Sequence, residues 1–428
     1  MILKVPAVKY LKGRIQLPGS KSYSIRAFMI AACGGRSTII HPSDCDDALV
    51  ALQVASALGS QIHRVGNNIW EIRAGERRVS SSRIHVGESG TVLRFVLPLL
   101  SLQNRRWVVE GKGTLQGRPN DHLTRTLRSM GVDIRGVGER ESIPIIIKSG
   151  RIHGGKIKID GSLSSQFVSA LLITAPQLKD DTTLTIQGKK MVSLDYIAMT
   201  RQVLQKSGIK IFLRNKRTFY IKGNQRFGGL KNFSIPSDYG LAAFHMAAAA
   251  LVPSDVTLLG SLKNDLIQAD GRILEFLRKM GVEFLKTAHS IKIKGPFTIK
   301  GGIFSLKDSP DLVPIMTVLA LFADRKTKIV DIHHARVKES DRISDLRHEL
   351  LRIGAKIKET DSGLMIEPQK KYKSNCLLDP HRDHRLAMAF AVLGLKVSVH
   401  VKDIECCSKS YPRFVADFKK LGIPASRI

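Results

Sequence analysis

A glycine that directly follows an expected helix recurs six times along the chain at nearly constant spacing. The intervals between these glycines are 72, 77, 73, 73 and 68 residues. A glycine just past a helix end takes the left-handed conformation that closes the helix. Six such stops therefore predict six copies of one structural unit; the alternative is ordinary α/β packing without a repeat. The segments ALGSQI, SMGVDI, KSGIKI, KMGVEF, RIGAKI and KLGIPA contain Gly59, Gly131, Gly208, Gly281, Gly354 and Gly422.

A second series of segments runs in step with the first, and each member is a polar turn that opens a strongly apolar helix. Helices that are apolar on most sides are buried. Their first turns carry unpaired N–H groups and the positive end of the helix dipole, which bind anions. Strand-like stretches such as KIKID, TFYIKG and SIKIKG lie between the helices. We expect two α/β domains of three units each. The polar turns lie near residues 20, 88, 163, 238, 310 and 383.

The composition limits the class of protein. A chain of 428 residues predicts two or three domains. The apolar runs are too short to span a membrane, and we expect no membrane partner. Five cysteines without a C-x-x-C pair favour reduced thiols in a cytoplasmic protein. The net charge of +31 suits either nucleic acid or anionic small ligands. Scattered basic residues and only 6% aromatic residues favour the small ligands.

The first polar turn, GSKS, carries a lysine and serine but lacks the glycine spacing of a Walker A loop. In a helix that starts near Ser20, Ser22 and Arg26 are four residues apart and share a face. Cations in a first helical turn oppose the dipole, so Lys21 and Arg26 gain from a bound anion. The alternative is a solvated surface. The opposite, apolar stripe is formed by Ile25, Phe28, Met29 and Ala32.

Three further polar clusters contain groups capable of binding or acid–base chemistry. In SSQ, two hydroxyls open a buried helix and suit a phosphate, although capping explains one of them. In RVKESDR, Lys338 and Arg342 are four apart, and Glu339 is a carboxylate among cations. In RDHR, Asp383 suits a helix cap while Arg385 faces outward from the first turn. The segment SPDL adds Asp311 beside another buried helix, where capping is again the alternative.

The motif series resembles the 5-enolpyruvylshikimate-3-phosphate synthase family. The segments LPGSKSYSIRA, GESGTVLR, GRPNDHL, DGSLSSQFVSALL, SPDLVPIMTVLALFA, RVKESDRI and DHRLAMAFAVLGL occur in the family's order and span nearly the whole chain. The resemblance implies two inverse α/β barrels, each of three βαβαββ repeats with buried helices and outer sheets, which close on a cleft. The expected domains are 17–237 and, for the second, 1–16 with 238–428. We expect a monomer by default.

The resemblance also implies a reaction and the residues that perform it. The family moves the enolpyruvyl group of phosphoenolpyruvate onto the 5-hydroxyl of shikimate 3-phosphate by addition and elimination. Asp311, Glu339 and Lys21 are the implied catalytic residues, and no metal or organic cofactor is implied. The implied contacts of shikimate 3-phosphate are Lys21, Ser22, Arg26, Ser164, Ser165, Gln166, Ser193, Asp311 and Lys338. The implied contacts of phosphoenolpyruvate are Lys21, Gly90, Arg118, Gln166, Arg342, Arg385 and Lys409.

Some positions depart from the family's usual pattern. Glu88 and Ser89 replace the usual Asn and Ala or Ser before Gly90, and a carboxylate there weakens phosphoenolpyruvate binding unless it points away or pairs with a cation. His334 stands where some members use Asn, and residues 239–241 replace a serine-rich turn. Gly90 leaves the space that glyphosate uses in sensitive members, so we expect sensitivity.

Three alternatives compete with this interpretation. The sister enolpyruvyl transferase that acts on UDP-N-acetylglucosamine carries a cysteine in a mobile loop, and the matching stretch EGKGTLQGRPNDHL has none. A basic nucleic-acid-binding protein would bind with a steep salt dependence and would not need Asp311. The third alternative is an inactive paralogue.

Overall fold

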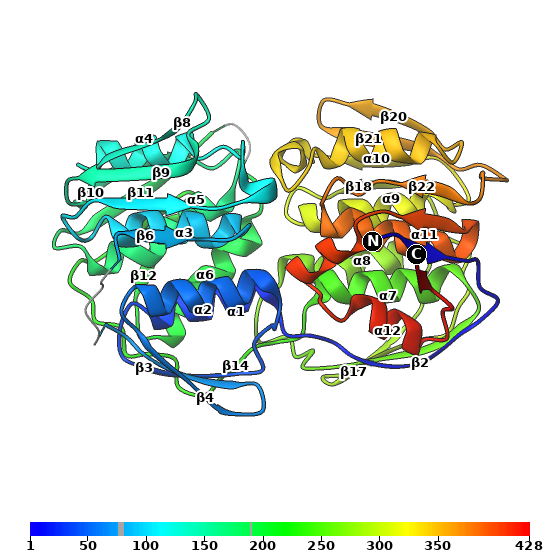
Figure 1. The fold of residues 1–428 in the computed structure, drawn as a ribbon, viewed down its shortest axis with the longest axis horizontal. Coiled ribbons are helices and arrows are strands. Elements are labelled where there is room, and N and C mark those ends of the chain that lie inside the picture. The colour runs from blue at the N-terminus through cyan, green and yellow to red at the C-terminus, as the bar shows by residue number, and fades with distance from the viewer. Residues whose placement is uncertain (76–80, 189–190) are drawn as a thin grey trace. The chain divides into compact units, whose positions relative to one another are not determined.

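The computed structural model describes residues 1–75, 81–188 and 191–428, which divide into two compact units. One unit, here called the central unit, comprises Gly19–Ile235. The other, the terminal unit, comprises Met1–Pro18 and Pro236–Ile428. The terminal unit is therefore built from both ends of the chain, and its two pieces flank the central unit in the sequence (Figure 1).

The central unit contains three strand–helix–strand–helix–strand–strand units, and the first of them begins at helix α1 (Lys21–Ala31) and takes its first strand, β14 (Phe233–Ser234), from the end of the unit's sequence. Its buried helices open with the polar turns predicted above, and its amphipathic helices end at the predicted glycines. The strands are β3 Arg36–Ile40, β4 Gln61–Gly66, β5 Ile69–Arg73, β6 Arg83–His85, β7 Trp107–Glu110, β8 Asp133–Val137, β9 Ser142–Ser149, β10 Gly155–Asp160, β11 Thr182–Gln187, β12 Ile211–Asn215, β13 Thr218–Ile221 and β14 Phe233–Ser234. The helices are α1 Lys21–Ala31, α2 Asp46–Ala57, α3 Gly90–Leu100, η1 Gly113–Leu115, α4 Asp121–Ser129, α5 Ser165–Thr174, η2 Ala175–Gln177 and α6 Leu194–Lys206.

The terminal unit repeats the same sequence of elements, with the first two strands of the chain incorporated into two of its sheets. Its strands are β1 Leu3–Val5, β2 Leu11–Gln16, β15 Ser254–Leu259, β16 Leu285–Lys286, β17 Ser290–Ile293, β18 Ile303–Ser305, β19 Thr327–Val330, β20 Lys356–Thr360, β21 Gly363–Glu367, β22 Cys376–Leu378, β23 Val399–Val401 and β24 Ser426–Arg427. Its helices are α7 Tyr239–Leu251, η3 Ala269–Arg272, α8 Ile273–Lys279, η4 Pro310–Leu312, α9 Val313–Leu321, η5 His333–Val337, α10 Arg342–Leu351, α11 His384–Val397, η6 Ile404–Lys409 and α12 Phe414–Lys420.

Among the described residues the strands form six four-stranded sheets, three in each unit. Each sheet has one parallel pair followed by two antiparallel pairs, as in β10–β11–β13–β12. In the terminal unit β2 pairs in parallel with β15, and β1 pairs with both β23 and β24. In the central unit the last strand, β14, completes the sheet of β3, β5 and β4. The repeated pairing confirms the six-unit prediction.

The predicted glycines close their helices through positive φ angles. Gly59, Gly131 and Gly208 have φ of 99°, 95° and 88°, and the three in the terminal unit lie between 80° and 85°. Residues with a side chain avoid this region because Cβ approaches the following carbonyl oxygen. The glycines are therefore required by the backbone at the end of each amphipathic helix.

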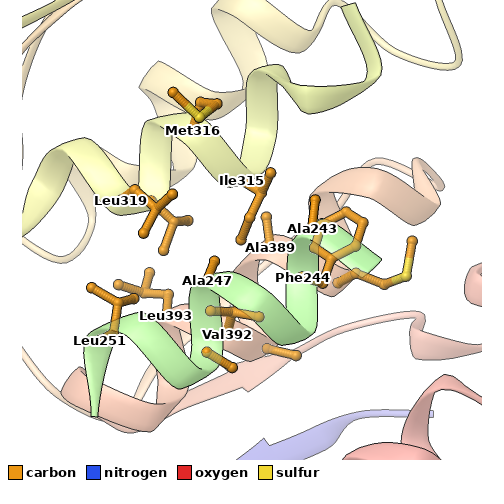
Figure 2. Close-up of a cluster of buried hydrophobic side chains, with 14 of the residues drawn as sticks. Ala243, Phe244, Ala247, Leu251, Ile315, Met316, Leu319, Ala389, Val392 and Leu393 are labelled. Atoms are coloured by element: carbon orange, nitrogen blue, oxygen red, sulfur yellow. The ribbon is translucent and has the colours of Figure 1, made fainter. Parts of the chain in front are cut away.

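The core of the terminal unit lies between the three apolar helices α7, α9 and α11, which pack against one another. Every residue of α7 is buried, including the apolar Phe244 and Leu251. Figure 2 shows side chains of α7 interleaved with Ile315 and Leu319 of α9 and Val392 of α11. In the central unit α3 packs against both α1 and α5, and the three helices are buried. Burial on all sides explains why these helices carry so few polar residues beyond their first turns.

Candidate active site

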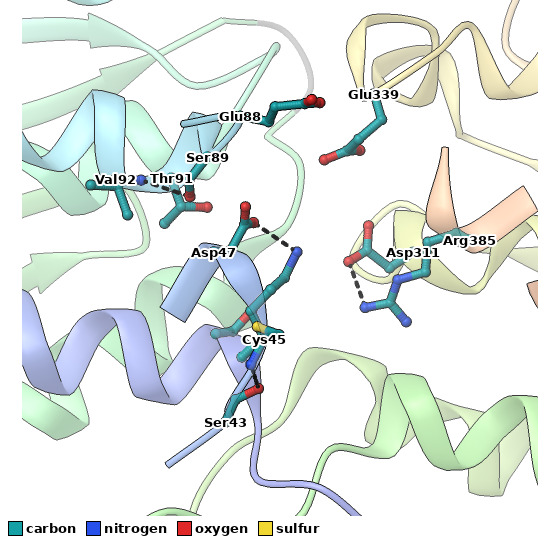
Figure 3. Close-up of polar contacts among 12 residues, drawn as sticks. Ser43, Cys45, Asp47, Glu88, Ser89, Thr91, Val92, Asp311, Glu339 and Arg385 are labelled. Carbon is teal, nitrogen blue, oxygen red and sulfur yellow. Dashed lines mark hydrogen bonds and ion pairs between the residues drawn. The ribbon is translucent and has the colours of Figure 1, made fainter. Parts of the chain in front are cut away.

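The first turn of α1 holds Lys21 in an ion pair that the sequence did not predict. Its Nζ lies 3.1 Å from Oδ2 of Asp47, in the first turn of α2. The two side chains are only 11% and 6% exposed, so the pair is screened little by solvent. Figure 3 shows Asp47 beside Cys45, whose buried thiol has its pKa raised by burial to about 12. Cys45 is thus a neutral neighbour, and Asp47 is the group that fixes Lys21.

Arg26 differs from its predicted setting. The sequence placed it with Ser22 on a polar face of α1, yet residues 23–31 are all buried and no solvated stripe exists there. Its guanidinium donates to the Ser22 carbonyl, to Thr200 Oγ1 and to the Tyr196 carbonyl. Burial lowers the pKa of Arg26 to about 10. The expected separation of polar and apolar faces was wrong because α6 covers the side on which Arg26 lies.

The serines of SSQ stand at the start of α5, as the polar turn predicted. Ser164 is the N-cap, and its hydroxyl accepts from the backbone N–H of Gln166 at 3.3 Å. Ser164 and Ser165 are both buried. Ser193 precedes α6 in the left-handed conformation, with φ 57°, and its buried Oγ has no hydrogen-bond partner among the described residues. A buried, unpaired hydroxyl is the kind of group that a ligand satisfies.

Gly90 is the first residue of α3, and its missing side chain makes room for arginine groups. A Cβ at this position would lie 2.9 Å from Nη1 of Arg118, which is buried. The neighbouring Ser89 caps the helix by accepting from Val92 N, as drawn in Figure 3. The unusual Glu88 accepts from the backbone N–H and the hydroxyl of Thr114 at 3.2 and 3.1 Å. These two bonds hold its carboxylate on the η1 segment.

In the terminal unit a single buried guanidinium, that of Arg342, binds three carboxylates. Its Nε lies 2.7 Å from Asp383 Oδ2, its Nη1 2.7 Å from Asp311 Oδ1 and its Nη2 2.9 Å from Glu339 Oε2. Further bonds reach the Pro310 carbonyl and the second Asp383 oxygen. The three carboxylates hold the pKa of Arg342 well above its usual range, although burial acts to lower it. Arg342 therefore brings the predicted acid–base residues Asp311 and Glu339 together.

Asp311 lies among cations rather than at a helix cap. It is in η4, and its Oδ2 is 3.1 Å from Arg385 Nη2, as drawn in Figure 3. Burial acts to raise the pKa of Asp311, but the charges of Arg385, Arg342 and Lys338 outweigh it and hold the pKa well below its usual range. The carboxylate is ionised, which a proton acceptor requires. The capping alternative for Asp311 is therefore wrong.

Two predictions about the basic residues of this unit need correction. Arg385 does not face outward: it is 2% exposed, and a Cβ on Gly240 would lie 2.8 Å from its Nη1. This close approach explains the glycine in the unusual 239–241 segment. Lys338 follows η5 and precedes α10, so it shares no helix with Arg342 and their four-residue spacing has no helical meaning. Asp383 caps α11 by accepting from Arg385 N, as predicted.

Two further positions discussed from the sequence, Lys409 and His334, are buried. Lys409 ends η6 and is 6% exposed. His334 is fully buried in η5, and neither ring nitrogen has a hydrogen-bond partner among the described residues. Burial, with the charge of Lys338, lowers the pKa of His334 to about 2, so the ring is neutral. A neutral ring resembles the asparagine of other family members in carrying no charge.

Sequence reasoning missed the residues that hold the predicted ones in place. Asp47, which pairs with Lys21, could have been found as an acidic residue in a first helical turn, and Asp383 was predicted as a helix cap but not as the partner of Arg342. Arg94, a cation inside an otherwise apolar helix, is also buried. Within the described parts of the chain no cluster of three or more His, Cys, Asp or Glu residues suits a metal ion. No described helix is both long and apolar enough to cross a membrane.

Comparisons with a family model and with curated relatives agree on one enzyme family. A family model described as EPSP synthase (3-phosphoshikimate 1-carboxyvinyltransferase) matches residues 5–418. The 3-phosphoshikimate 1-carboxyvinyltransferase of Methanococcus aeolicus is 33% identical, over 98% of both chains. That of Clostridium beijerinckii is 32% identical over 96% of this chain and 95% of its own.

Solved structures resemble the chain over its full length. An EPSP synthase structure from Acinetobacter baumannii has a TM-score of 0.80 and 26% identity, and the match covers 100% of each chain. The enolpyruvyl transferase NikO from Streptomyces tendae has a TM-score of 0.79 at 18% identity, which shows the fold alone. It covers 99% of this chain and 98% of its own.

Proposed function

Because the chain belongs to the EPSP synthase family and transfers the enolpyruvyl group of phosphoenolpyruvate to shikimate 3-phosphate, we propose that Asp311, Glu339 and Lys21 carry out its acid–base steps. The observation that carries this proposal is the arrangement around Arg342. One guanidinium contacts Asp311 at 2.7 Å and Glu339 at 2.9 Å. Two carboxylates fixed to one cation can serve as base and acid on neighbouring atoms of bound substrates.

The reaction has an addition and an elimination. In the addition, Asp311 takes the proton of the 5-hydroxyl, whose oxygen bonds to C2 of phosphoenolpyruvate while the methylene carbon gains a proton from Glu339 or Lys21. In the elimination, the bond from C2 to the phosphate oxygen breaks and the methyl group returns its proton. Inorganic phosphate leaves with the proton that Asp311 took from the hydroxyl, and the enol ether remains on the ring. Fixed cations stabilise the charge that develops in both steps.

Phosphoenolpyruvate is proposed to contact Gly90, Arg118, Gln166, Arg385 and Lys409, together with Arg342 and Lys21. Arginines bind carboxylate and phosphate groups in two-pronged geometry. All five N–H groups of Arg342 are engaged by protein acceptors, since two belong to Nη1, two to Nη2 and one to Nε. A substrate carboxylate must therefore take over donors from Asp311 or Glu339. That exchange would release a catalytic carboxylate when the substrate binds.

Shikimate 3-phosphate is proposed to bind the serines at the helix starts and the neighbouring cations. Support comes from the cap position of Ser164 and from the buried, unpaired hydroxyl of Ser193. Arg26 retains a second N–H on each terminal nitrogen beyond its bonds to Ser22 and Tyr196. The full proposed set is Lys21, Ser22, Arg26, Ser164, Ser165, Gln166, Ser193, Asp311 and Lys338.

Phosphate release tests the proposed function directly. The protein is mixed with phosphoenolpyruvate and either shikimate 3-phosphate or UDP-N-acetylglucosamine, and inorganic phosphate is followed over time. We expect release only with shikimate 3-phosphate. Release with the nucleotide sugar alone would assign the sister activity, and no release with either would contradict the proposal.

We further propose that the enzyme is inhibited by glyphosate, that it is a monomer and that it is cytoplasmic. The absence of a side chain at Gly90, beside Arg118, supports glyphosate binding. All five cysteines, each in a described part of the chain, are free thiols, which suits a reducing compartment. Unchanged turnover at saturating glyphosate would contradict the proposed inhibition. Light scattering after gel filtration measures the molecular mass in solution, and a mass above that of one chain would contradict the monomer.

A further inference from the structure

The amide of Gln166 is held at both ends by residues of α3. Its Oε1 accepts from Nη1 of Arg94, and its Nε2 donates to Thr91 Oγ1 at 2.9 Å. Arginine donates only, so the oxygen must face Arg94 and the nitrogen must face Thr91. The second hydrogen of Nε2 can then be offered to a ligand. The contacts thus determine which end of the amide serves as donor.

Arg94 is itself fixed inside the central unit. Its side chain is buried, its Nε donates to Asn120 Oδ1 at 3.2 Å and its Nη2 to the Pro119 carbonyl at 3.0 Å. The guanidinium carbon lies 5.2 Å from the centre of the Phe167 ring, which suits a cation–π contact. A cation with three oriented bonds and a ring against it has little freedom to move.

The same network reaches Arg118. Asn120, which accepts from Arg94, donates through Nδ2 to the Arg118 carbonyl at 3.0 Å. A Cβ on Gly90 would lie 2.9 Å from Arg118 Nη1 and 3.1 Å from Arg94 Nη1, so both guanidinium groups lie against the same backbone atom. Arg94 and Arg118 therefore belong to one hydrogen-bonded network, and Arg94 is the member that contacts Gln166.

We propose that Arg94 is a positioning residue for the transfer reaction, which locks the amide of Gln166 so that its N–H is directed at the substrates. This inference rests on the substrate-binding role proposed for Gln166. Arg94 acts through that amide and makes no substrate contact of its own. Lysine at position 94 would keep the charge but lose the planar fork that fixes Asn120, Pro119 and Gln166 together.

A double-mutant cycle tests the proposal. The kcat and KM for both substrates are measured for the native protein, Arg94→Lys, Gln166→Ala and the double variant. We expect Arg94→Lys to lower kcat/KM by about 10- to 100-fold in the native background, the scale of loss from misplaced groups. In the Gln166→Ala background the loss should fall below about threefold, because the residue it positions is gone. The matched control is Arg125→Lys, an exposed arginine of α4, which should leave both constants unchanged.

The outcomes distinguish the role of Arg94 from the role of Gln166. An equal loss in both backgrounds, or no loss in the native one, overturns the positioning role of Arg94. Full activity of Gln166→Ala alone contradicts the role of Gln166, and with it this inference, while native phosphate release still upholds the overall reaction. If Arg94→Lys does not fold by circular dichroism, Thr91→Val replaces it. That variant removes the hydroxyl that accepts from Gln166 Nε2 and leaves the charge unchanged. A loss of kcat/KM that disappears in the Gln166→Ala background supports the proposal, and an equal loss in both backgrounds overturns it.

Discussion

At the scale of single residues, the groups proposed for the acid–base steps are held by charge partners of opposite sign. Lys21 is paired with Asp47, and Asp311 and Glu339 are paired with Arg342. Such pairs fix the direction of a charged group, at a desolvation cost that the partner offsets. The pair of Lys21 shows that a residue proposed for catalysis can have a partner, Asp47, that the sequence motifs do not identify.

The Lys21–Asp47 pair leads to a prediction. Asp47→Asn should lower kcat/KM by about tenfold, because a buried ammonium loses the carboxylate that directs it. Asp46→Asn changes the same charge one residue earlier in the same helical turn, where the side chain is exposed, and should have no effect. Steady-state phosphate release measures both variants. Equal activities of Asp47→Asn and the native protein would show that Lys21 needs no partner.

At the scale of elements, the repeat was predictable because glycine has a unique backbone role at helix ends. All six glycines have the positive φ that the pattern indicated, and each apolar segment is a buried helix. The strand pairing was less accessible, because β1, β2 and β14 join sheets whose other strands lie far away in sequence. The family resemblance implied that residues 1–16 belong with residues 238–428, but it gave no strand pairing.

The glycine rule can be tested at the end of α12. Gly422 has φ 85° and open space where a Cβ would be, so Gly422→Ala introduces backbone strain without a clash. We expect a loss of about 1–2 kcal/mol in the free energy of unfolding, measured with urea. Gly271→Ala is the control, because that glycine has no positive φ and its Cβ would make ordinary contacts at 3.7 Å or more. Equal stability of the two variants would argue against the rule.

At the scale of the whole molecule, the fold and the reaction class followed from the sequence, but the partners of the site residues did not. The two-domain α/β fold and the transferase family are confirmed. The outward orientation predicted for Arg385 was wrong, and so was the expected separation of polar and apolar faces around Arg26, because spacing along one helix says nothing about which element covers it. Apart from the contact of Arg342 with Glu339, the contacts that hold Arg342 and Arg94 join residues 25 to 72 positions apart.

Two buried histidines of the terminal unit predict acid sensitivity. Burial lowers the pKa of His245 to about 4, although the nearby charge of Asp417 acts to raise it. Burial also lowers the pKa of His334, to about 2. The unfolded chain therefore binds protons at a higher pH than the folded one. Stability is full above about pH 6.5 and falls with decreasing pH, by about 1.4 kcal/mol per pH unit for each histidine.

Urea unfolding at pH 7.5 and pH 5.0 measures this loss. His245→Gln keeps a donor for Tyr411, which His245 contacts at 3.0 Å, and should reduce the loss by about 2 kcal/mol. The exposed His289→Gln should leave it unchanged. A loss of the same size in all three proteins would assign the acid sensitivity to other groups.

The central claim, that Asp311 is the base held ready by Arg342 and Arg385, is tested most directly by comparing turnover with binding in Asp311→Asn. The variant keeps the shape of the side chain and removes its basicity. The account predicts a fall in kcat of about 100-fold or more, with the Kd of shikimate 3-phosphate by calorimetry changed less than about threefold. Asp255→Asn, a partly exposed carboxylate of the same unit, is the matched control. A native kcat in Asp311→Asn would contradict the account.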